Sequence, residues 1–201
     1  MTRAVIFDIG GVLIDWNPKH LYSKLLPDAA AIEAYLREIG FDEWNRALDA
    51  GGLWNDAIAE LVARHPHRQA LIEAAHLRWH EMLPGDIPGT VAILERLSVQ
   101  DVPLYAITNY STEKWVETRA RFPFFAHFRD IVVSADEKIM KPEAAIFRLC
   151  LDRNGLDAKD CLFIDDLAHN IEGARAVGID AILFQSPEQL EEGLKKRQLL
   201  S

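Results

Sequence analysis

The chain has 201 residues, and 49% of them are hydrophobic, which is enough for one well-buried core or for a core with a small helical addition. Its 31 acidic side chains outnumber its 22 lysines and arginines, giving a formal net charge of −9. Because this balance repels phosphate backbones and anionic lipid, we expect neither nucleic acid nor a membrane as a partner.

Cysteine use and the first residues indicate the cellular compartment. Only Cys150 and Cys161 are present, too few to crosslink a secreted fold of this size. The chain starts with one basic residue and a brief apolar run over residues 4–7, without the long apolar stretch and small-residue cleavage site of a signal peptide. No later segment reaches transmembrane length. We therefore expect a cytoplasmic protein.

The first predicted strand covers residues 3–8 and ends in the carboxylate of Asp8. Residues 17–83 then read as successive helices, because apolar residues recur at spacings of three and four in two parts of this stretch, residues 30–36 and 57–62. The stretch contains no convincing strand. We predict a small α-helical cap domain over residues 16–83, inserted directly above the loop that follows Asp8.

Helices and strands alternate strictly from residue 84 onward. The predicted helices are residues 90–100, 112–120, 143–154 and 170–177. Each precedes a predicted strand, and these strands are residues 103–107, 130–133, 161–164 and 181–184. Such alternation predicts an α/β fold with a doubly wound, Rossmann-like parallel sheet, in a core domain made of residues 1–15 and 84–201.

A carboxylate and two glycines end the first predicted strand. Asp8 is followed by Gly10 and Gly11, and glycines leave the backbone N–H groups of such a turn unobstructed. This corner can hold an anion against a nucleophile. Taken alone, an aspartate that caps a glycine-rich turn is the commoner interpretation.

Two further segments carry groups that can bind phosphate or orient a carboxylate. Thr108 and Asn109 offer a hydroxyl and an amide donor to a phosphoryl oxygen, or else they cap the next helix. Lys141 precedes Pro142, which keeps the lysine backbone extended and leaves its ammonium free to reach into the cleft. The carboxyl ends of parallel strands meet at one edge of a sheet, so we expect these groups to gather around Asp8.

Two adjacent acids, Asp165 and Asp166, end another apolar run. They repel each other unless a cation or a lysine lies between them and Asp8. Magnesium fits such a site, because it binds oxygen ligands and keeps several of its waters. An acidic helix N-terminus is the alternative, but it explains one acid better than two.

The order of these motifs resembles that of the haloacid dehalogenase superfamily of aspartyl-nucleophile hydrolases, with a helical cap after the first motif. The resemblance covers essentially the whole chain. It is closest to the subgroup that contains α-D-glucose-1-phosphate phosphatases, on the segments at residues 7–12, 140–144 and 164–174.

The resemblance implies a role for each matching residue. Asp8 would attack phosphorus in line and form an aspartyl-phosphate, and Lys141 would neutralise charge and orient Asp8. The phosphoryl oxygens would be bound by Thr108, Asn109, Gly10 and Gly11. A Mg²⁺ ion would be held by Asp8, the Gly10 carbonyl and Asp166, with Asp165 and Asn170 as ligands or close neighbours. We therefore expect a Mg²⁺-dependent phosphatase whose partner is a small phosphate ester, and a homodimer stays open.

One position departs from the superfamily. Most of its phosphatases carry a second aspartate two residues after the nucleophile, where it protonates the leaving alcohol and then activates water. Gly10 occupies that position here, and loss of a general acid typically costs about 10²- to 10⁴-fold in rate. Two compensations are open: an acidic leaving group, such as the anomeric oxygen of a sugar 1-phosphate, or a substitute acid from the start of the cap, Asp15 or His20.

Two other functions stay open. A 2-haloacid dehalogenase expels halide without a proton, but that branch dispenses with Mg²⁺ and usually places Ser or Asn where this chain has its acid pair. A catalytically silent module would keep the phosphate pocket without turnover.

Several residues outside the motifs carry weaker signals. His76 and His80, with Glu81, lie at the spacing of one helix face, but no third ligand is spaced as a metal site requires. His169 follows the acid pair and is expected to start a helix, with a role as a proton shuttle as the less favoured alternative. The side chains of Trp16, Trp44, Trp54 and Arg46 either line a cap pocket or, in the case of the tryptophans, pack the cap helices.

Overall fold

The computed structural model describes residues 4–200. Five strands form one sheet: β1 (Ala4–Phe7), β2 (Leu104–Thr108), β3 (Asp130–Val133), β4 (Cys161–Asp165) and β5 (Asp180–Leu183). Their order is β3-β2-β1-β4-β5, and all neighbouring pairs are parallel. The predicted parallel α/β sheet is therefore confirmed. The predicted start of the first strand, Arg3, lies outside the described residues.

The central position of β1 determines where the candidate residues meet. Phe7 pairs with Ala106 of β2 on one side and with Ile164 of β4 on the other. The residues that follow these three strands must therefore lie side by side at the carboxyl edge. Asp8 is at the middle of that edge.

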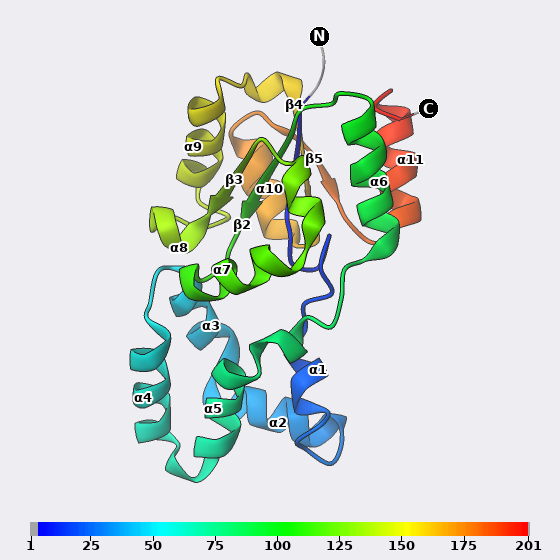
Figure 1. The fold of residues 1–201 in the computed structure, drawn as a ribbon. Helices are drawn as coiled ribbons and strands as arrows, with labels where there is room; N and C mark the ends of the chain where they lie inside the picture. The colour runs from blue at the N-terminus through cyan, green and yellow to red at the C-terminus, as the bar shows by residue number, and fades with distance from the viewer. Residues whose placement is uncertain (1–3, 201) are drawn as a thin grey trace.

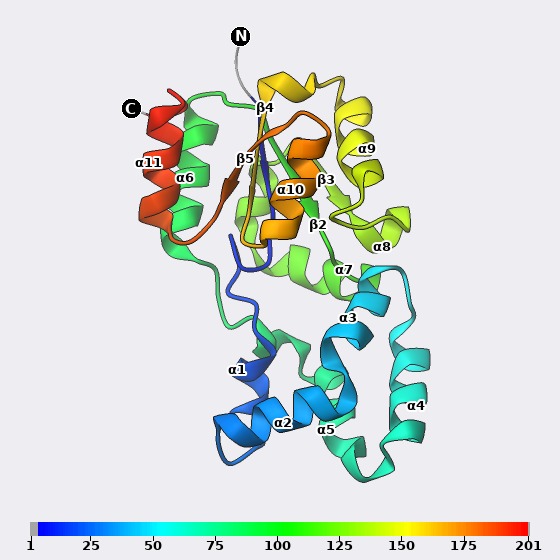
Figure 2. The ribbon, with the colours of Figure 1, turned by 180° about the vertical axis from the view of Figure 1, so that it is seen from behind.

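Helices cover both faces of the sheet (Figures 1 and 2). Alternate residues of β1 point to opposite faces, as they must in a strand. Ala4 and Ile6 pack in a cluster with α9 (Ala144–Asn154) and α10 (Ala168–Ala176). Val5 and Phe7 face the other side, which is covered by α6 (Pro88–Val99), α7 (Thr112–Arg121) and α11 (Pro187–Lys196). Both faces are buried, which explains why the strands read as continuous apolar runs.

The helical stretch between β1 and β2 lies against the carboxyl edge of the sheet (Figure 1). Its helices are α1 (Pro18–Tyr22), α2 (Ala29–Ile39), α3 (Phe41–Asp49), α4 (Trp54–Arg64) and α5 (Gln69–Leu77), with short 3₁₀ turns η1 (Pro66–Arg68) and η2 (Trp79–Met82). No strand forms within residues 18–82, as the periodicity predicts. No helix among residues 4–200 combines the length and the apolar character needed to span a membrane.

The predicted boundaries differ from the observed ones by two residues or fewer. The helix predicted from residue 90 begins at Pro88, because proline is favoured at the first helical position, where no N–H partner is needed. The short helix α8 (Ser134–Glu137) and the 3₁₀ turns η3 (Pro123–His127) and η4 (Ala158–Asp160) carry no periodic signal in the sequence.

One expectation about the cap helices is wrong. His76 and His80 do not share a helix face, because α5 ends at Leu77 and His80 belongs to the separate turn η2. The buried indole of Trp79 lies between them in sequence and packs inward.

Direct contacts hold the cap helices against the sheet edge. The Trp54 indole N–H donates to Ser111 Oγ at 2.9 Å, and Ser134 Oγ donates to the backbone carbonyl of Asp49 at 2.6 Å. The rings of Trp79 and Tyr110 meet edge to face with centroids 6.0 Å apart. These contacts join α3, α4 and η2 to the loop that follows β2 and to α8, which follows β3 directly.

Candidate active site

Asp8 is fixed at the end of β1 by backbone contacts. Its N–H donates to the carbonyl of Ile164 at 2.8 Å, which continues the pairing with β4. Its Oδ1 accepts the N–H of Ile9 at 2.6 Å. The side chain is buried, so its orientation is set by the strand and by the turn that follows.

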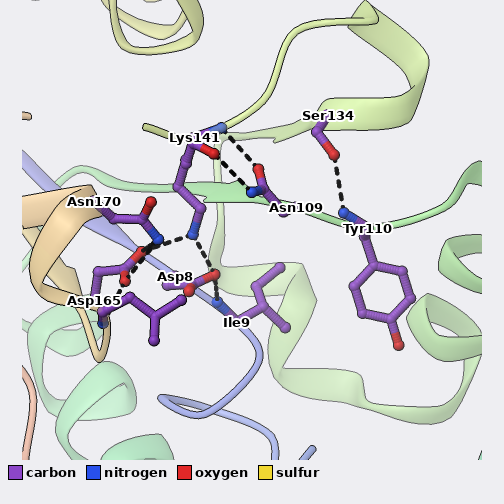
Figure 3. A network of polar contacts seen from close by, with 9 residues as sticks. Asp8, Ile9, Asn109, Tyr110, Ser134, Lys141, Asp165 and Asn170 are labelled. Atoms are coloured by element: carbon purple, nitrogen blue, oxygen red, sulfur yellow. Dashed lines mark hydrogen bonds and ion pairs between the residues drawn. The ribbon is translucent and has the colours of Figure 1, made fainter. Parts of the chain in front are cut away.

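Lys141 is a buried cation shared by two carboxylates (Figure 3). Its Nζ lies 2.7 Å from Asp8 Oδ1 and 2.7 Å from Asp165 Oδ2. The lysine is only 3% exposed. Burial by itself lowers the pKa of Lys141, but the charges of Asp165 and Asp8 outweigh it, and the pKa is raised. The lysine therefore stays charged and holds the nucleophile candidate in place.

Asp165 is committed to interactions within the protein. Its Oδ1 accepts the Leu167 N–H at 2.8 Å, and the Asn170 amide donates to Oδ1 and Oδ2 at 3.0 and 3.1 Å. Burial raises the pKa of Asp165, but Lys141 more than reverses this effect and the pKa is lowered. A carboxylate with this many partners is suited to orienting Lys141.

The side chain of Asn109 positions Lys141. Its Nδ2 donates to the Lys141 carbonyl at 3.0 Å, and its Oδ1 accepts the Lys141 N–H at 2.9 Å (Figure 3). The side-chain amide is therefore engaged by the protein, and the backbone N–H is the donor left for a phosphoryl oxygen. The peptide bond between Lys141 and Pro142 is cis.

Close packing of α10 supports the same loop. A Cβ atom on Gly173 would lie 2.5 Å from the Pro142 carbonyl oxygen and 3.0 Å from the Phe147 ring. Only glycine permits this approach, so the residue fixes the distance between α10 and the loop that carries Lys141.

Three carboxylates could hold a metal ion together. Asp8, Asp165 and Asp166 each offer an oxygen atom, and these atoms lie within 4.8 Å of one another. Burial raises the pKa of Asp8 well above its usual range; Lys141 opposes this, and the other two acids add to it. Burial, followed by the charge of Asp165, also raises the pKa of Asp166. Because one ammonium group faces three carboxyl groups, the cluster carries excess negative charge when all three are ionised. A divalent cation would neutralise that charge.

The turn after β1 is shaped to admit Asp166. Gly11 has a φ of +75°, and a Cβ atom there would lie 2.5 Å from Asp166 Oδ2. The missing side chain therefore makes room for the carboxylate. With the Gly10 carbonyl in the same turn, this oxygen-only donor set fits Mg²⁺.

The site opens into a cavity of about 900 Å³ between the sheet edge and the cap. The sheet side contributes Asp8, Thr108 and Lys141, and the cap side contributes Asn45, Arg46 and Asp49 among others. Such a volume is typical of a small-molecule site.

One face of α3 supplies half of the cap residues that line the cavity. Its inward positions, Phe41, Trp44 and Leu48, are buried in the cap core. The intervening polar positions, which line the cavity, are Asp42, Asn45, Arg46 and Asp49. Their spacing of three and four residues is that of a single helix face, but the sequence pattern alone does not distinguish such a face from one exposed to solvent.

Other predicted candidates divide between the cavity and its surroundings. Besides the residues already placed, the predicted candidates that line the cavity are Gly10, Gly11, Trp16, Asn109, Asp166, His169 and Asn170. Trp44 and Trp54 pack together in the cap with ring centroids 5.4 Å apart, whereas Trp79, which the sequence did not single out, lines the cavity. The described lining does not include Asp15 or His20, which lie 3.0 Å from each other.

Comparison with known protein families matches residues 2–178 to the haloacid dehalogenase-like hydrolases. This chain belongs to that family. The hydrolase is 28% identical over 199 residues to a sesquiterpene phosphatase of Aspergillus oryzae, covering 98% of this chain and 96% of that protein. It is 27% identical over 214 residues to a ribulose-1,5-bisphosphate 5-phosphatase of Halopiger xanaduensis, covering 94% and 87% of the two chains.

The hydrolase also corresponds to one part of a longer relative. Mouse acyl-CoA dehydrogenase family member 10 is 25% identical over 92% of this chain, which spans only 18% of that protein. Among solved structures, an enzyme of this family from Bacteroides thetaiotaomicron superimposes with a TM-score of 0.72 at 21% identity, over 92% of this chain and 94% of that one. That similarity supports the fold described above.

Proposed function

We propose that this hydrolase is a Mg²⁺-dependent phosphatase that cleaves a small phosphate ester through an aspartyl-phosphate on Asp8. The observation that carries the proposal is the buried lysine that joins Asp8 to Asp165 at the floor of a cavity lined by polar cap residues. Two of its relatives are phosphatases by name, and the related enzyme of Bacteroides thetaiotaomicron has been crystallised with magnesium and inorganic phosphate.

Asp8, Thr108, Lys141 and the turn at residues 10–11 form the bottom of the cavity, here called the phosphate floor, and each has a role in this proposal. Asp8 attacks phosphorus in line with the leaving oxygen, and Lys141 orients Asp8 and stabilises its ionised form. The phosphoryl oxygens are bound by the Thr108 hydroxyl, the Asn109 backbone N–H and the turn at residues 10–11. Positioning and charge neutralisation of this kind are the main requirements of phosphoryl transfer.

A bound Mg²⁺ would be held by Asp8, the Gly10 carbonyl and Asp166, and it supplies positive charge to the phosphoryl group. Asp165 supports this set from behind, because its oxygens are already engaged by Lys141, Leu167 and Asn170.

We further propose that the leaving group carries hydroxyl groups, with a sugar 1-phosphate as the first candidate. The α3 face offers an acid, an amide and a guanidinium to the cavity through Asp42, Asn45 and Arg46. Groups of this kind pair with hydroxyls, and the acidic anomeric oxygen departs with less proton assistance than an ordinary alkoxide. Such a specificity would place the hydrolase beside the α-D-glucose-1-phosphate phosphatases. The cap at residues 16–83 would then bind the leaving group, and the core at residues 1–15 and 84–201 would bind the phosphate.

The test is release of inorganic phosphate from a panel of phosphate esters, including glucose 1-phosphate, glucose 6-phosphate and p-nitrophenyl phosphate, with Mg²⁺ or with a chelator. Asp8→Asn is compared with Asp15→Asn, which makes the same charge change on a half-exposed side chain outside the described cavity lining. We expect metal-dependent release that Asp8→Asn abolishes and Asp15→Asn retains. Absence of release from every ester would contradict the proposal, and halide release from 2-haloacids would then replace it.

A further inference from the structure

The turn after Asp8 lacks a proton donor. Gly10 has no side chain, and neither of the substitute acids considered from the sequence, Asp15 and His20, is part of the described cavity lining. A leaving alkoxide would therefore depart without a proton unless another group supplies one.

Asp49 is an acid on the opposite wall of the same cavity. It is the last residue of α3 and lines the cavity together with Asp8 and Lys141. Asn45 Nδ2 donates to Asp49 Oδ2 at 3.0 Å, which orients the carboxyl group. The charge of Lys141, whose ammonium contacts Asp8, is close enough to lower the pKa of Asp49.

The backbone at Asp49 is anchored to the sheet edge. Ser134 Oγ donates to the Asp49 carbonyl at 2.6 Å. The chain then turns through Gly51, which has a φ of +104° and where a Cβ atom would lie 3.2 Å from the Ala135 carbonyl oxygen. The cap carboxyl is thereby held at a fixed place above the phosphate floor.

We propose that Asp49 is the general acid and base of this hydrolase, taking the role that Gly10 cannot fill. The inference rests on the proposed phosphatase function. It assigns the proton transfer to the cap, so that the residue that binds near the leaving group also protonates it.

The two steps balance as follows. In the first, Asp8 forms a bond to phosphorus, the bond from phosphorus to the leaving oxygen breaks, and the Asp49 carboxyl proton passes to that oxygen. In the second, a water oxygen bonds to phosphorus while its proton passes to the Asp49 carboxylate. The bond from phosphorus to Asp8 breaks, which restores the Asp8 carboxylate and releases inorganic phosphate.

The protonation behaviour of Asp49 suits both steps. Burial raises its pKa to about 7, and Lys141 and the Ser111 backbone N–H oppose this rise. Tyr110 also faces Asp49 closely enough for their charges to interact. The remaining titratable groups of the cavity wall are Asp8, Asp42, Arg46, Lys141, Asp166 and His169. A group that titrates near neutral pH can donate a proton in one step and accept one in the next.

The deciding experiment compares Asp49→Asn with wild type on two esters in Mg²⁺. p-Nitrophenyl phosphate has a leaving group that needs little protonation, whereas ethyl phosphate releases an alkoxide and carries no further hydroxyl for the cap to bind. We expect kcat/KM to fall by about 10²-fold or more for ethyl phosphate and by less than about tenfold for the aryl ester. The limb of the pH profile that reports the acid should also disappear with the alkyl ester. Equal losses on both esters, or no loss, would overturn the inference.

Asp42→Asn is the matched control. It makes the same charge change on the same face of α3, so a general electrostatic effect should appear in it as well. We expect Asp42→Asn to change both esters by a similar factor. A preferential loss with the alkyl ester in this variant would overturn the assignment to Asp49.

A rescue variant uses the space at position 10. A Cβ atom on Gly10 would lie 3.7 Å from its nearest neighbour, Trp16 Cβ, which is ordinary contact. We expect Gly10→Asp to restore alkyl ester turnover to the Asp49→Asn protein by at least about tenfold, because it returns an acid to the cavity. Failure of a folded double variant to recover would count against the inference.

A measurement on the wild-type protein does not depend on how the variants fold. The Asp49 carboxyl carbon, observed by ¹³C NMR in the Mg²⁺-loaded protein, should titrate near neutral pH. Titration near the ordinary aspartate value of about 3.9 would overturn the inference. If wild type releases no phosphate from either ester, the phosphatase proposal fails first; if wild type is active and Asp49→Asn is equally active, only the role of Asp49 fails.

Discussion

Replacement of Lys141 by methionine should be among the most destabilising single changes in this hydrolase. The lysine makes ion pairs of 2.7 Å with both Asp8 and Asp165 and is 3% exposed. Removing one partner of a buried ion pair costs about 3–5 kcal/mol, because the remaining charge stays buried and uncompensated. Lys141→Met leaves two such charges facing each other, so we expect the upper part of this range at pH 7.

The loss should depend on pH in a defined direction. In wild type the folded-state pKa of Asp165 is lowered, so this group stabilises the fold above its unfolded pKa and the contribution is lost as pH falls through the folded pKa. The pKa of Asp8 is already raised in wild type, so its charged form opposes folding as pH rises. Without Lys141, burial and mutual repulsion raise the folded pKa of Asp8 further and also raise that of Asp165. The variant is then most stable when both are protonated and loses stability as pH rises. The difference from wild type should therefore shrink between pH 7 and pH 4.

The assay is urea unfolding at both pH values in a chelator, since added Mg²⁺ would neutralise the same carboxylates. Lys159→Met is the control, because Lys159 also forms an ion pair, with Asp157 at 2.8 Å, but is exposed to solvent. We expect little change in that control. A loss below about 1 kcal/mol in Lys141→Met, or the same loss at both pH values, would refute the reasoning.

Three further predictions concern the metal site and the loop behind it. Gly11→Ala should weaken Mg²⁺ binding in a calorimetric titration, because the methyl group would lie 2.5 Å from Asp166 Oδ2. The left-handed backbone at this position also costs about 1–2 kcal/mol once the residue has a side chain. Unchanged Mg²⁺ affinity would contradict the proposed site. Asp166→Asn should abolish the rise in melting temperature that Mg²⁺ gives wild type through preferential binding to the folded state, and a retained rise would exclude Asp166 as a ligand. Gly173→Ala should lower both kcat and the free energy of unfolding, the latter by about 1–3 kcal/mol, because the added methyl group would lie 2.5 Å from the Pro142 carbonyl oxygen. Wild-type kcat and stability in this variant would contradict the prediction and show that the loop tolerates displacement.

The sheet and the polar residues at its carboxyl edge are predictable because two simple patterns coincide. Strands buried on both faces read as short apolar runs, and polar residues directly after them must meet at the carboxyl edge. Asp8 directly follows β1, and Thr108 and Asp165 are the last residues of β2 and β4, so all three lie at that edge. Lys141 does not follow a strand, but its place before Pro142 and a helix marks it as the end of a loop that can reach the same edge.

The rest of the site depends on contacts that sequence spacing does not contain. The side chain of Asn109 is engaged by the backbone of Lys141, 32 residues away, and no local pattern distinguishes this role from phosphate binding. Asp49 lies on a polar helix face that looks, from the sequence, like any face exposed to solvent. Only the packing of α3 against the sheet edge turns that face toward the phosphate floor.

In the proposed mechanism, Asp8 carries the phosphoryl group between the two steps. The most direct measurement is rapid quenching of turnover with p-nitrophenyl phosphate, followed by mass spectrometry of the peptide that contains Asp8. We predict a hydroxylamine-sensitive phosphoryl group on Asp8 that accumulates in Asp49→Asn, since hydrolysis of the intermediate then lacks its base. Phosphate release from wild type with no phosphorylated peptide in either protein, or a phosphoryl group on another residue, would contradict the account.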